Sequence, residues 1–349
     1  MTAPSPATGS YADGSALRLG LLSTARINDS LLEGAAGTDA AEVVAVASRT
    51  EARAAAYARE RGIPRAHGSY EALLADPEVD AVYVALPNDL HASWSIRALE
   101  AGKHVLCEKP LARTAAAAEG AYAAADRAGR VLMEAFMWRH LPQTRTLVEL
   151  VRDGAVGRVR LVRCAFTFVL DRPEDFRTRP EHEGGALMDV GCYCVSAIRL
   201  LAGEPQRAHA EQVLGGGGVD VVLAGVLHLP DDVVGVFDCG FVMPSRETLE
   251  VVGEDGVLVV PDPWIARGAP LALRRGDDVE TIATERANPY QLELENLAAA
   301  AAGTAPPLLG RADAVGQARA IELLYASAAW SRPFGVCPRA REGSSVPGP

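Results

Sequence analysis

The feature that most constrains the fold is an alternation of short apolar runs with Ala-rich amphipathic stretches between residues 17 and 137. The apolar runs have the length of buried strands, and the stretches between them have the period of helices that pack on a sheet. Five such units in one order predict an α/β fold with a doubly wound parallel sheet. The expected strands are Leu17–Leu22, Val43–Ala47, Ala81–Leu86, His104–Cys107 and Val131–Ala135, and the clearest expected helices are Glu51–Arg61 and His91–Ala101.

Beyond residue 139 the pattern changes to strand-like runs with little helix between them, which predicts a second α/β domain with an open, mostly antiparallel sheet. The four glycines 215–218 are expected to form a hairpin loop, because no helix follows them as a phosphate-binding loop requires. We expect domains at 17–139 and 140–335, with a flexible tail at 1–16 and a loose one at 336–349. The second domain should contain a helix at Gln143–Asp153, strands at Arg158–Val169, His209–Val213, Val219–Leu229 and Val233–Val242, and closing helices at Asn288–Ala302 and Arg311–Ala328.

Charge and hydropathy restrict the partners of this chain. Its 349 residues carry a formal net charge of -11 without a Lys/Arg cluster, which argues against binding to nucleic acid or to an anionic membrane. No apolar stretch approaches the roughly 18 residues that a membrane span needs, and the N-terminus lacks the features of a secretory signal. The six cysteines show no Cys-x-x-Cys spacing, so we expect small reduced core residues and no metal site. We therefore expect a cytoplasmic protein.

The turn after the first expected strand is where the pyrophosphate of a dinucleotide would meet a helix N-terminus. The fingerprint Gly-x-Gly-x-x-Gly would fall on Ser23, Ala25 and Asn28, so all three glycines are replaced. Ser23 and Ala25 still permit close backbone approach, whereas Asn28 predicts a slightly wider gap between helix and strand. An ordinary βα turn is the alternative. The cofactor-binding residues expected here are Gly20, Ser23, Thr24, Ala25, Arg26 and Ile27.

The end of the second strand distinguishes between the two nicotinamide dinucleotides. An acidic residue there binds the ribose 2′-hydroxyl, whereas arginine or small polar residues accommodate a 2′-phosphate. This chain has Ser48 and Arg49 at that place, which favours NADP(H) over NAD(H), and Thr50 can cap the next helix. A solvated Arg49 beside an ordinary turn serine is the alternative.

Lys109 is the candidate catalytic residue. The run that begins at Lys103 ends in Glu108-Lys109-Pro110, so Lys109 lies at the carboxyl edge of the sheet, where ligands of open α/β sheets bind. A lysine there can hold a substrate oxygen and stabilise the charge that develops on it during hydride transfer. The Lys109–Pro110 bond is a candidate cis peptide. Taken alone, Glu-Lys-Pro fits a surface turn equally well.

Five ordered segments together specify a family. They are Gly-Leu-Leu-Ser-Thr-Ala-Arg-Ile (20–27), Leu-Pro-Asn-Asp-Leu-His (86–91), Ala-Gly-Lys-His-Val-Leu-Cys-Glu-Lys-Pro-Leu (101–111), Glu-Ala-Phe-Met-Trp-Arg (134–139) and Gly-Gly-Ala-Leu-Met-Asp-Val-Gly-Cys-Tyr (184–193). With these segments the chain resembles the Gfo/Idh/MocA oxidoreductases over roughly Leu17–Leu324. The resemblance implies a Rossmann domain, then an α/β domain with an open antiparallel sheet, an active site between the two, and frequently a homodimer or homotetramer built on that sheet.

The resemblance assigns a substrate-binding catalytic role to Lys109 and gives it a partner in Tyr193. Many members of the family have histidine there, and tyrosine is typical of the glucose-fructose oxidoreductase, xylose dehydrogenase and sugar 3-ketoreductase branch. On a helix Asp189 and Tyr193 would share one face, with Gly191 leaving room for a ligand. We expect the nearby lysine to favour the phenolate of Tyr193, which would make it a proton donor and acceptor. Asp189 would bind substrate hydroxyls or orient Lys109. A core tyrosine and a capping aspartate are the alternatives.

The resemblance also implies cofactor contacts along the edge of the first sheet. The Leu86-Pro87-Asn88 turn should lie beside the nicotinamide ribose, with His91 at the start of the next helix. A helix cap is the alternative role of Asn88 or Asp89. The remaining expected cofactor residues are Glu108, which should face the ribose, and Trp138 with Arg139, which should pack near the nicotinamide or the substrate entrance.

We therefore expect an NADP(H)-dependent oxidoreductase that transfers a hydride to or from a sugar or sugar-like alcohol or carbonyl. An aldose dehydrogenase of the xylose or glucose type is the first choice, and an NADPH-dependent ketoreductase of a nucleotide-activated deoxysugar is the alternative. A non-catalytic dinucleotide-binding sensor is a rival of another class, which the altered fingerprint permits. Retention of Lys109, Asp189 and Tyr193 argues against a sensor, because a sensor needs no proton relay.

Overall fold

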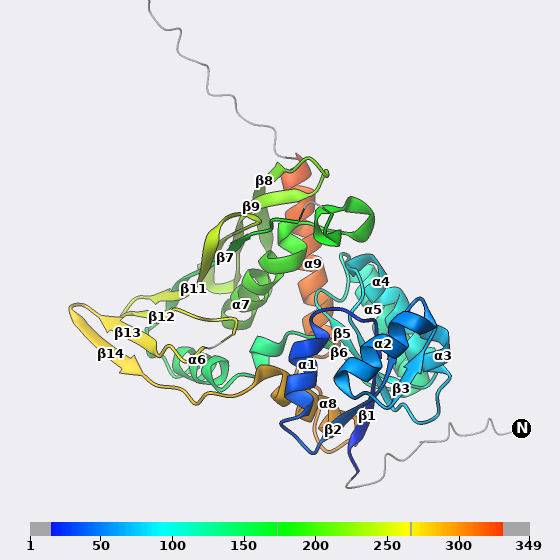
Figure 1. The fold of residues 1–349 in the computed structure, drawn as a ribbon. Coiled ribbons are helices and arrows are strands. Elements are labelled where there is room, and N and C mark those ends of the chain that lie inside the picture. Colours follow the sequence, from blue (N-terminus) through cyan, green and yellow to red (C-terminus); the bar gives the residue numbers. More distant parts are fainter. Residues whose placement is uncertain (1–14, 173, 266, 331–349) are drawn as a thin grey trace, which may run out of the picture.

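The computed structural model describes residues 15–172, 174–265 and 267–330. The two expected tails and Cys337 thus lie outside the described residues, except for Ser15 and Ala16. Two sheets organise the molecule, one in each half of Figure 1.

The first sheet has six parallel strands in the order β3-β2-β1-β4-β5-β6, which is the Rossmann order. This confirms the predicted doubly wound fold. The sequence missed β3, a three-residue edge strand whose side chains are all only half-buried. The strands are β1 (Leu17–Leu22), β2 (Ala41–Ala47), β3 (Arg65–His67), β4 (Ala81–Val84), β5 (His104–Glu108) and β6 (Leu132–Ala135).

Side-chain caps set the starts of several helices around this sheet. Thr50, as expected, accepts a hydrogen bond from the backbone of Arg53, and Ser69 and Thr114 cap the next helices in the same way. Gly62 ends α2 in the left-handed conformation that glycine adopts most readily. The helices are α1 (Asn28–Ala35), α2 (Glu51–Arg61), α3 (Tyr70–Leu74), α4 (Asn88–Glu100) and α5 (Ala115–Ala128).

The second sheet has eight strands in the order β14-β13-β12-β11-β7-β10-β9-β8, antiparallel except for the β7–β10 pair. The glycines 215–218 join β8 to β9 as a hairpin, as expected. The expected strand Val233–Val242 is divided between β10 and β11. These two strands run in opposite directions, because β10 is parallel to β7 and β11 is antiparallel to it. The strands are β7 (Val159–Val169), β8 (Arg207–Leu214), β9 (Asp220–His228), β10 (Val234–Gly240), β11 (Val242–Gly253), β12 (Val257–Val260), β13 (Leu271–Arg275) and β14 (Asp278–Ile282).

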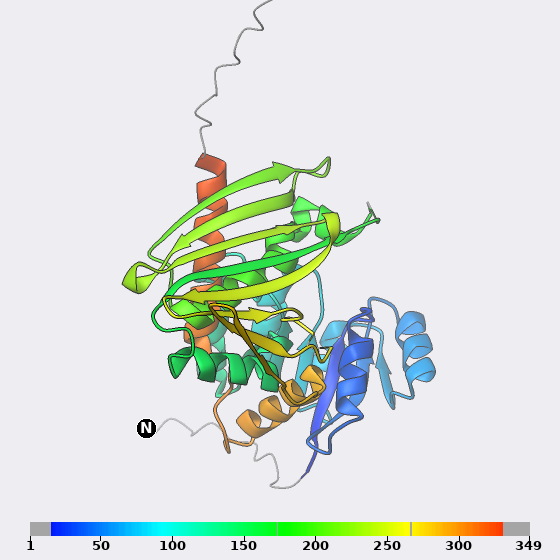
Figure 2. The ribbon, with the colours of Figure 1, turned by 90° about the vertical axis from the view of Figure 1, so that its left-hand side faces the viewer.

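Within the described residues, helices cover one face of the second sheet and leave the other without a helix (Figures 1 and 2). On that face lie α7 (Cys192–Ala202) and the last helix, α9 (Arg311–Trp330), whose Leu324 reaches β9 at Gly225. The other face is open, and Figure 2 shows it toward the viewer. Helices α8 (Pro289–Ala301) and α9 return to the first sheet, where α8 packs on α1 and α9 packs on α5. The C-terminal segment therefore ties the two sheets together.

One described helical stretch, residues 180–202, is long and apolar enough by composition to cross a membrane, with a mean hydropathy of 1.4. The expectation that no stretch approaches that length is therefore wrong. The reason is that two short helical segments, 180–182 and 187–191, precede α7 in close succession. In the structure 72% of this apolar window is buried inside the protein, as in the core helices of proteins without a membrane span.

The cysteines within the described residues are free and buried, as the sequence predicts for small core residues: Cys107, Cys164, Cys192, Cys194 and Cys239.

Candidate active site

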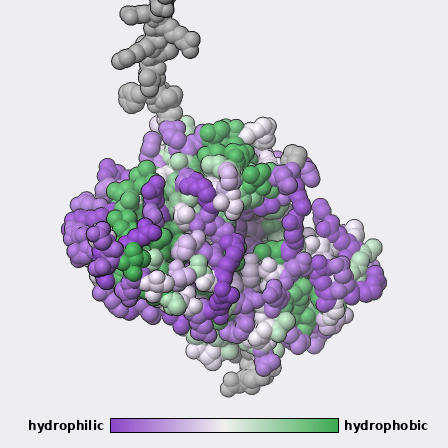
Figure 3. Space-filling model, turned by 60° about the vertical axis from the view of Figure 1, so that its left-hand side comes forward, coloured by the Kyte–Doolittle hydropathy of each residue, from purple (hydrophilic) through white to green (hydrophobic). Residues whose placement is uncertain are grey.

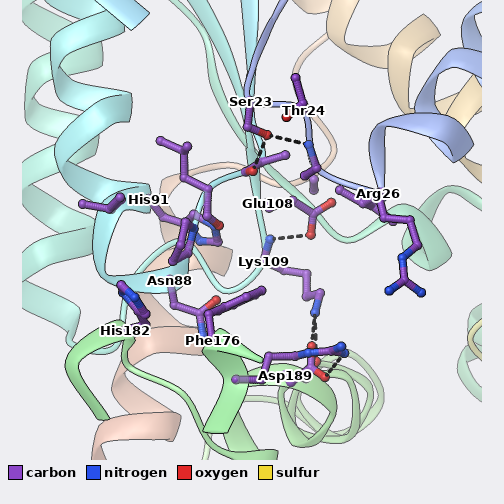
Figure 4. A pocket seen from close by; sticks show the side chains of 18 of the residues that line it. Ser23, Thr24, Arg26, Asn88, His91, Glu108, Lys109, Phe176, His182 and Asp189 are labelled. Atoms are coloured by element: carbon purple, nitrogen blue, oxygen red, sulfur yellow. Dashed lines mark hydrogen bonds and ion pairs between the residues drawn. The ribbon is translucent and has the colours of Figure 1, made fainter. Parts of the chain in front are cut away.

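A cavity of about 990 Å³ lies between the carboxyl edge of the first sheet and the second domain. The turns that follow β1, β2, β4, β5 and β6 form one wall. Short helical turns of the second domain and the start of α8 form the other. Figure 4 shows Lys109 between these walls, with Ser23 and Thr24 on one side and Asp189 on the other.

The β1–α1 turn lines the cavity with all the residues expected there except Gly20. Ser23, in the first glycine position of the fingerprint, donates a hydrogen bond from its hydroxyl to Ala85 O (2.7 Å) and accepts one from Ala25 N (3.1 Å). Asn28, in the third position, is fully buried and donates from Nδ2 to Ser23 O (2.9 Å). The hydrogen bonds of Ser23 and Asn28 thus stabilise a turn whose shape usually depends on glycines. The gap between helix and strand predicted from Asn28 stays a prediction.

Gly20 does not line the cavity, and its assignment to the cofactor site stays a prediction. It lies inside β1, and a Cβ at this position would come within 2.8 Å of the Leu73 side chain. Glycine is needed here because α3 packs closely on the strand.

The end of β2 brings cationic and polar side chains into the cavity. Ser48 and Arg49 line it as predicted, together with Tyr70. Arg53, which the sequence analysis missed, lines it as well and donates from Nε to Thr24 Oγ1 (2.8 Å). Within the described residues neither arginine has a carboxylate partner. Arg53 lies one helical turn after the strand end, so an inspection of the first turn of α2 would have found it.

Lys109 lies at the centre of the cavity, and its peptide bond to Pro110 is cis, as expected. Its Nζ donates to the backbone oxygen of Asp189 (2.9 Å) and to Asp189 Oδ1 (3.2 Å). Burial is the largest single effect and lowers the pKa of Lys109, but the neighbouring acidic groups, chiefly Asp189, together outweigh it, and the net pKa is raised above its ordinary value. The side chain is therefore a fixed cation across the neutral pH range.

Asp189 and Tyr193 both line the cavity, from the junction of a π-helix, η4 (Leu187–Gly191), with α7. The Lys109 ammonium lies 5.2 Å from the centroid of the Tyr193 ring. Gly191 does not leave room for a ligand, which corrects the prediction. A Cβ there would come within 2.7 Å of Cys239 Sγ, so Gly191 faces the second sheet and permits the π-helix to pack on it.

Burial raises the pKa of Tyr193 well above 10, which reverses the expected direction. The ring is enclosed by aromatic side chains, with centroids at 5.5 Å for Phe136, 5.4 Å for Phe166 and 5.7 Å for Trp264. Loss of solvent around the phenol is the largest effect and outweighs any stabilisation of the phenolate by the lysine. Tyr193 thus holds its proton at neutral pH.

Arg177 is the most important residue that the sequence analysis missed. It lies on η2 (Phe176–Thr178), a short 3₁₀ turn that lines the cavity. Its Nη1 bonds Asp189 Oδ2 (3.1 Å), and its Nε and Nη2 bond the two carboxylate oxygens of Asp175 (2.9 Å each). The sequence carried no signal for this role, because an isolated Asp-Phe-Arg in a loop fits a solvated surface equally well.

Asn88 and Asp89 hold the second domain at the entrance of the cavity. Asn88 Nδ2 donates to Glu183 O (2.9 Å), and Asp89 Oδ1 lies 3.1 Å from His182 Nδ1. Asn88 does not cap α4, since the residue before the helix is Pro87 and no side-chain cap is present. The alternative role of Asn88 as a helix cap is therefore wrong.

His91 and Glu108 support the turn that carries Lys109. The buried His91 ring lies between Pro110 O (2.9 Å) and Leu86 O (2.7 Å) and thus joins two turns of the cavity wall. Glu108 accepts a hydrogen bond from the Tyr83 hydroxyl and another from Lys109 N (3.2 Å). Leu86, Pro87, Asn88, His91 and Glu108 all line the cavity.

Trp138 and Arg139 do not line the cavity, and the expected contact of these two residues with cofactor or substrate stays a prediction. The 3₁₀ turn η1 (Met137–His140) after β6 presents Met137 to the cavity and turns the next side chains away from it. Trp138 is buried edge-on against Trp264, with centroids 5.4 Å apart. Arg139 pairs with Asp313 (3.3 Å) and lines a separate cavity of about 480 Å³.

Comparison with known proteins agrees with this geometry. Residues 21–136 match the oxidoreductase family with an NAD-binding Rossmann fold, and residues 144–259 match the GFO/IDH/MocA C-terminal domain. D-xylose 1-dehydrogenase (NADP(+)) 2 of Haloferax volcanii is 40% identical over 319 residues, which cover 89% of this chain and 97% of that protein.

Solved structures share the whole fold. The aldose-aldose oxidoreductase of Caulobacter crescentus in complex with glycerol superposes with a TM-score of 0.84 at 28% identity, over 90% of this chain and 98% of that one. The 3-ketoreductase KijD10 of Actinomadura kijaniata, in complex with NADP and TDP-benzene, gives 0.83 at 29% identity with the same coverage.

Proposed function

The chain belongs to the Gfo/Idh/MocA family of oxidoreductases, and from this premise we propose that it uses NADP(H) to transfer a hydride to or from a sugar or sugar-like alcohol, first of all an aldose at its anomeric carbon. The observation that carries the proposal is the contact of Lys109 with Asp189 across the cavity, beside Tyr193. A non-catalytic sensor would need none of these three side chains to converge.

NADP(H) fits the wall formed by the first sheet. The β1–α1 turn presents the start of a helix, which suits a pyrophosphate, and Ser48, Arg49 and Arg53 offer hydrogen bonds and positive charge at the end of β2. No acidic side chain pairs with these arginines within the described residues, so a 2′-phosphate would meet uncompensated cations. When bound, the cofactor supplies the hydride or accepts it.

Lys109 is suited to bind the oxygen of the reacting carbon. An ammonium group has three N–H donors, and two of them are used by Asp189. One donor remains for the substrate. Because Asp189 also fixes the position of the ammonium, the cation meets the charge that develops on the oxygen without having to reorganise. Asp189 is thus a positioning residue for Lys109.

Tyr193 is suited to move the proton. Since its phenol is protonated at neutral pH, it can donate to the oxygen when a carbonyl is reduced. In the oxidative direction the phenol must first lose its proton and then takes the proton of the substrate hydroxyl. The hydride leaves the same carbon, so a carbonyl forms and the atoms balance.

Two observations bear on the substrate. The xylose dehydrogenase relative and the aldose-aldose oxidoreductase structure support an aldose. The likeness to the sugar 3-ketoreductase supports the second candidate, reduction of a keto group on a nucleotide-activated deoxysugar. The higher identity over nearly the whole chain favours the aldose.

The test follows NADPH absorbance with panels of aldoses, ketoses and dTDP-keto-sugars. We expect NADP⁺ reduction with a pentose or hexose, and turnover confined to a dTDP-keto-sugar would establish the second candidate instead. Tight NADPH binding without turnover of any of these compounds would refute the catalytic proposal.

The open face of the second sheet supports a homodimer or homotetramer. Side chains that alternate with the buried ones on β9 leave Val226 42% exposed, while its neighbour Leu227 packs beneath the sheet. Figure 3, turned toward this side, shows apolar patches among hydrophilic ones. We propose that a second copy covers this face and that the free buried cysteines suit the reducing cytoplasm. Light scattering during gel filtration would measure the assembly.

A further inference from the structure

We infer that the Asp175–Arg177 pair makes the site select its substrate by charge. The pair completes a network of two cations and two carboxylates at the reacting end of the cavity. This network favours binding of an uncharged polyol over binding of its anionic derivative. The inference rests on the proposed function, because it concerns the same site. It assigns Arg177 and Asp175 as specificity-determining residues.

The network is continuous from the first domain to the second. Lys109 Nζ donates a hydrogen bond to Asp189 Oδ1 (3.2 Å), and Arg177 Nη1 donates one to Asp189 Oδ2 (3.1 Å). Arg177 also donates from Nε and Nη2 to the two carboxylate oxygens of Asp175. Each oxygen of Asp189 therefore faces a different cation. Two positive and two negative charges leave the network itself without net charge. Outside the network, the carboxyl group of Glu108 lines the cavity beside Lys109, and Arg172 acts on Asp175 from the solvent side of the pair.

The four groups are buried enough for their charges to act strongly on a ligand. The exposed fractions of the side chains are 14% for Lys109, 15% for Asp189, 26% for Arg177 and 13% for Asp175. Burial raises the pKa of Asp175, but the bonds and charge of Arg177 bring it below its ordinary value. Asp175 therefore carries its negative charge at neutral pH, and solvent screens the network only in part.

The other arginines of the cavity do not compensate a substrate anion. Arg26, Arg49 and Arg53 lie on the β1–α1 turn and at the start of α2, where the phosphates of the cofactor would add negative charge. His182 faces Asp89. A carboxylate on the sugar would thus lose its hydration next to Asp189 and Asp175 without meeting an unpaired cation.

Two substitutions change the balance in opposite directions. Asp175→Asn leaves a net positive charge and keeps the Oδ1 acceptor that the backbone N–H of Arg177 uses at the start of η2. Arg177→Gln leaves a net negative charge. If the pair has only a structural role, both variants should bind every ligand more weakly and to the same extent. If it selects by charge, the affinities for neutral and anionic ligands should change in opposite directions.

The experiment measures the dissociation constants of D-glucose and D-glucuronate by calorimetry on protein loaded with NADPH, in which oxidation cannot proceed. These ligands differ only in the group at C6. Relative to the wild type, we expect the preference for glucose over glucuronate to fall by about tenfold in Asp175→Asn and to rise by about tenfold in Arg177→Gln. Glu181→Gln removes an exposed carboxylate of the same segment and should leave the preference unchanged.

The result separates this inference from the proposed function. Binding of glucose with an equal shift, or no shift, of the preference in the two variants would overturn the charge selection while leaving the sugar site intact. Failure of the wild type to bind either sugar would overturn the inference, whereas the proposed function is overturned only by the absence of turnover across the substrate panel. Unchanged NADPH affinity in both variants confirms that they are folded.

Discussion

Replacing Lys109 by methionine separates catalysis from folding in this protein. Methionine keeps the length and apolar stem of lysine and removes the ammonium group. The loss of a cation that stabilises charge on the reacting oxygen typically lowers kcat by about 10² to 10³. We therefore expect at least a hundredfold lower kcat/KM in Lys109→Met with an aldose substrate.

The stability of this variant should change little, and the reason lies in Arg177. Removing one partner of a buried ion pair usually costs about 3–5 kcal/mol, because the other charge remains uncompensated. In this protein Asp189 keeps the Nη1 of Arg177 at 3.1 Å after Lys109 is gone. The loss in the free energy of unfolding should therefore stay near 1–2 kcal/mol.

The other buried lysine of the same region provides the control. Lys103 donates from Nζ to the backbone oxygens of Asp76 and Val79, both at 2.7 Å, and lies far from the cavity lining. Lys103→Met leaves two buried carbonyl groups without a donor, which should cost about 2–4 kcal/mol. Its kcat should equal that of the wild type wherever the variant is folded.

Urea unfolding followed by circular dichroism measures stability, NADPH fluorescence measures cofactor affinity, and initial rates give kcat/KM. A Lys109→Met enzyme that retains more than a tenth of the wild-type kcat/KM would refute the assigned role. A loss of NADPH affinity as large as the loss of activity would show instead that the lysine serves cofactor binding.

Three further predictions follow from the structure. Because burial raises the pKa of Tyr193 and oxidation needs its phenolate, the rate of oxidation should increase steadily from pH 7 to pH 10. Tyr193→Phe should be at least a hundredfold slower and should lose this pH dependence. A plateau of the wild-type rate near neutral pH would contradict the protonated phenol. Arg49→Ala should raise the dissociation constant of NADPH about tenfold and leave that of NADH within twofold. Arg59→Ala, on the helix that follows Arg49, is the control and should change neither constant. An equal loss for both cofactors in Arg49→Ala would exclude a 2′-phosphate contact. Val226→Asp should reduce the sedimentation coefficient to that of a monomer, and an unchanged value would place the interface elsewhere.

The sequence by itself determined the first sheet and much of the edge where the site lies. Hydrophobic periodicity is a local property, so it located five of the six strands and two of the helices between them, and it placed Lys109 at a strand end. Ser48 and Arg49, in place of an acidic residue, indicated the cofactor from the sequence for the same reason. This signal is also local, because it depends only on which residues directly follow the second strand.

The tertiary structure alone decided the contacts and the electrostatics. Lys109 and Asp189 are 80 residues apart in the chain, and Arg177 joins them from a loop that carries no pattern of its own. Burial depends on what packs around a group, and for this reason the pKa of Tyr193 moved opposite to expectation. The same dependence on packing turned Trp138, Arg139 and Gly191 away from the cavity, although their segments match the family motifs. A motif fixes where a residue lies along the chain, but the neighbours that reach it from distant segments determine which way its side chain faces and what charge it holds.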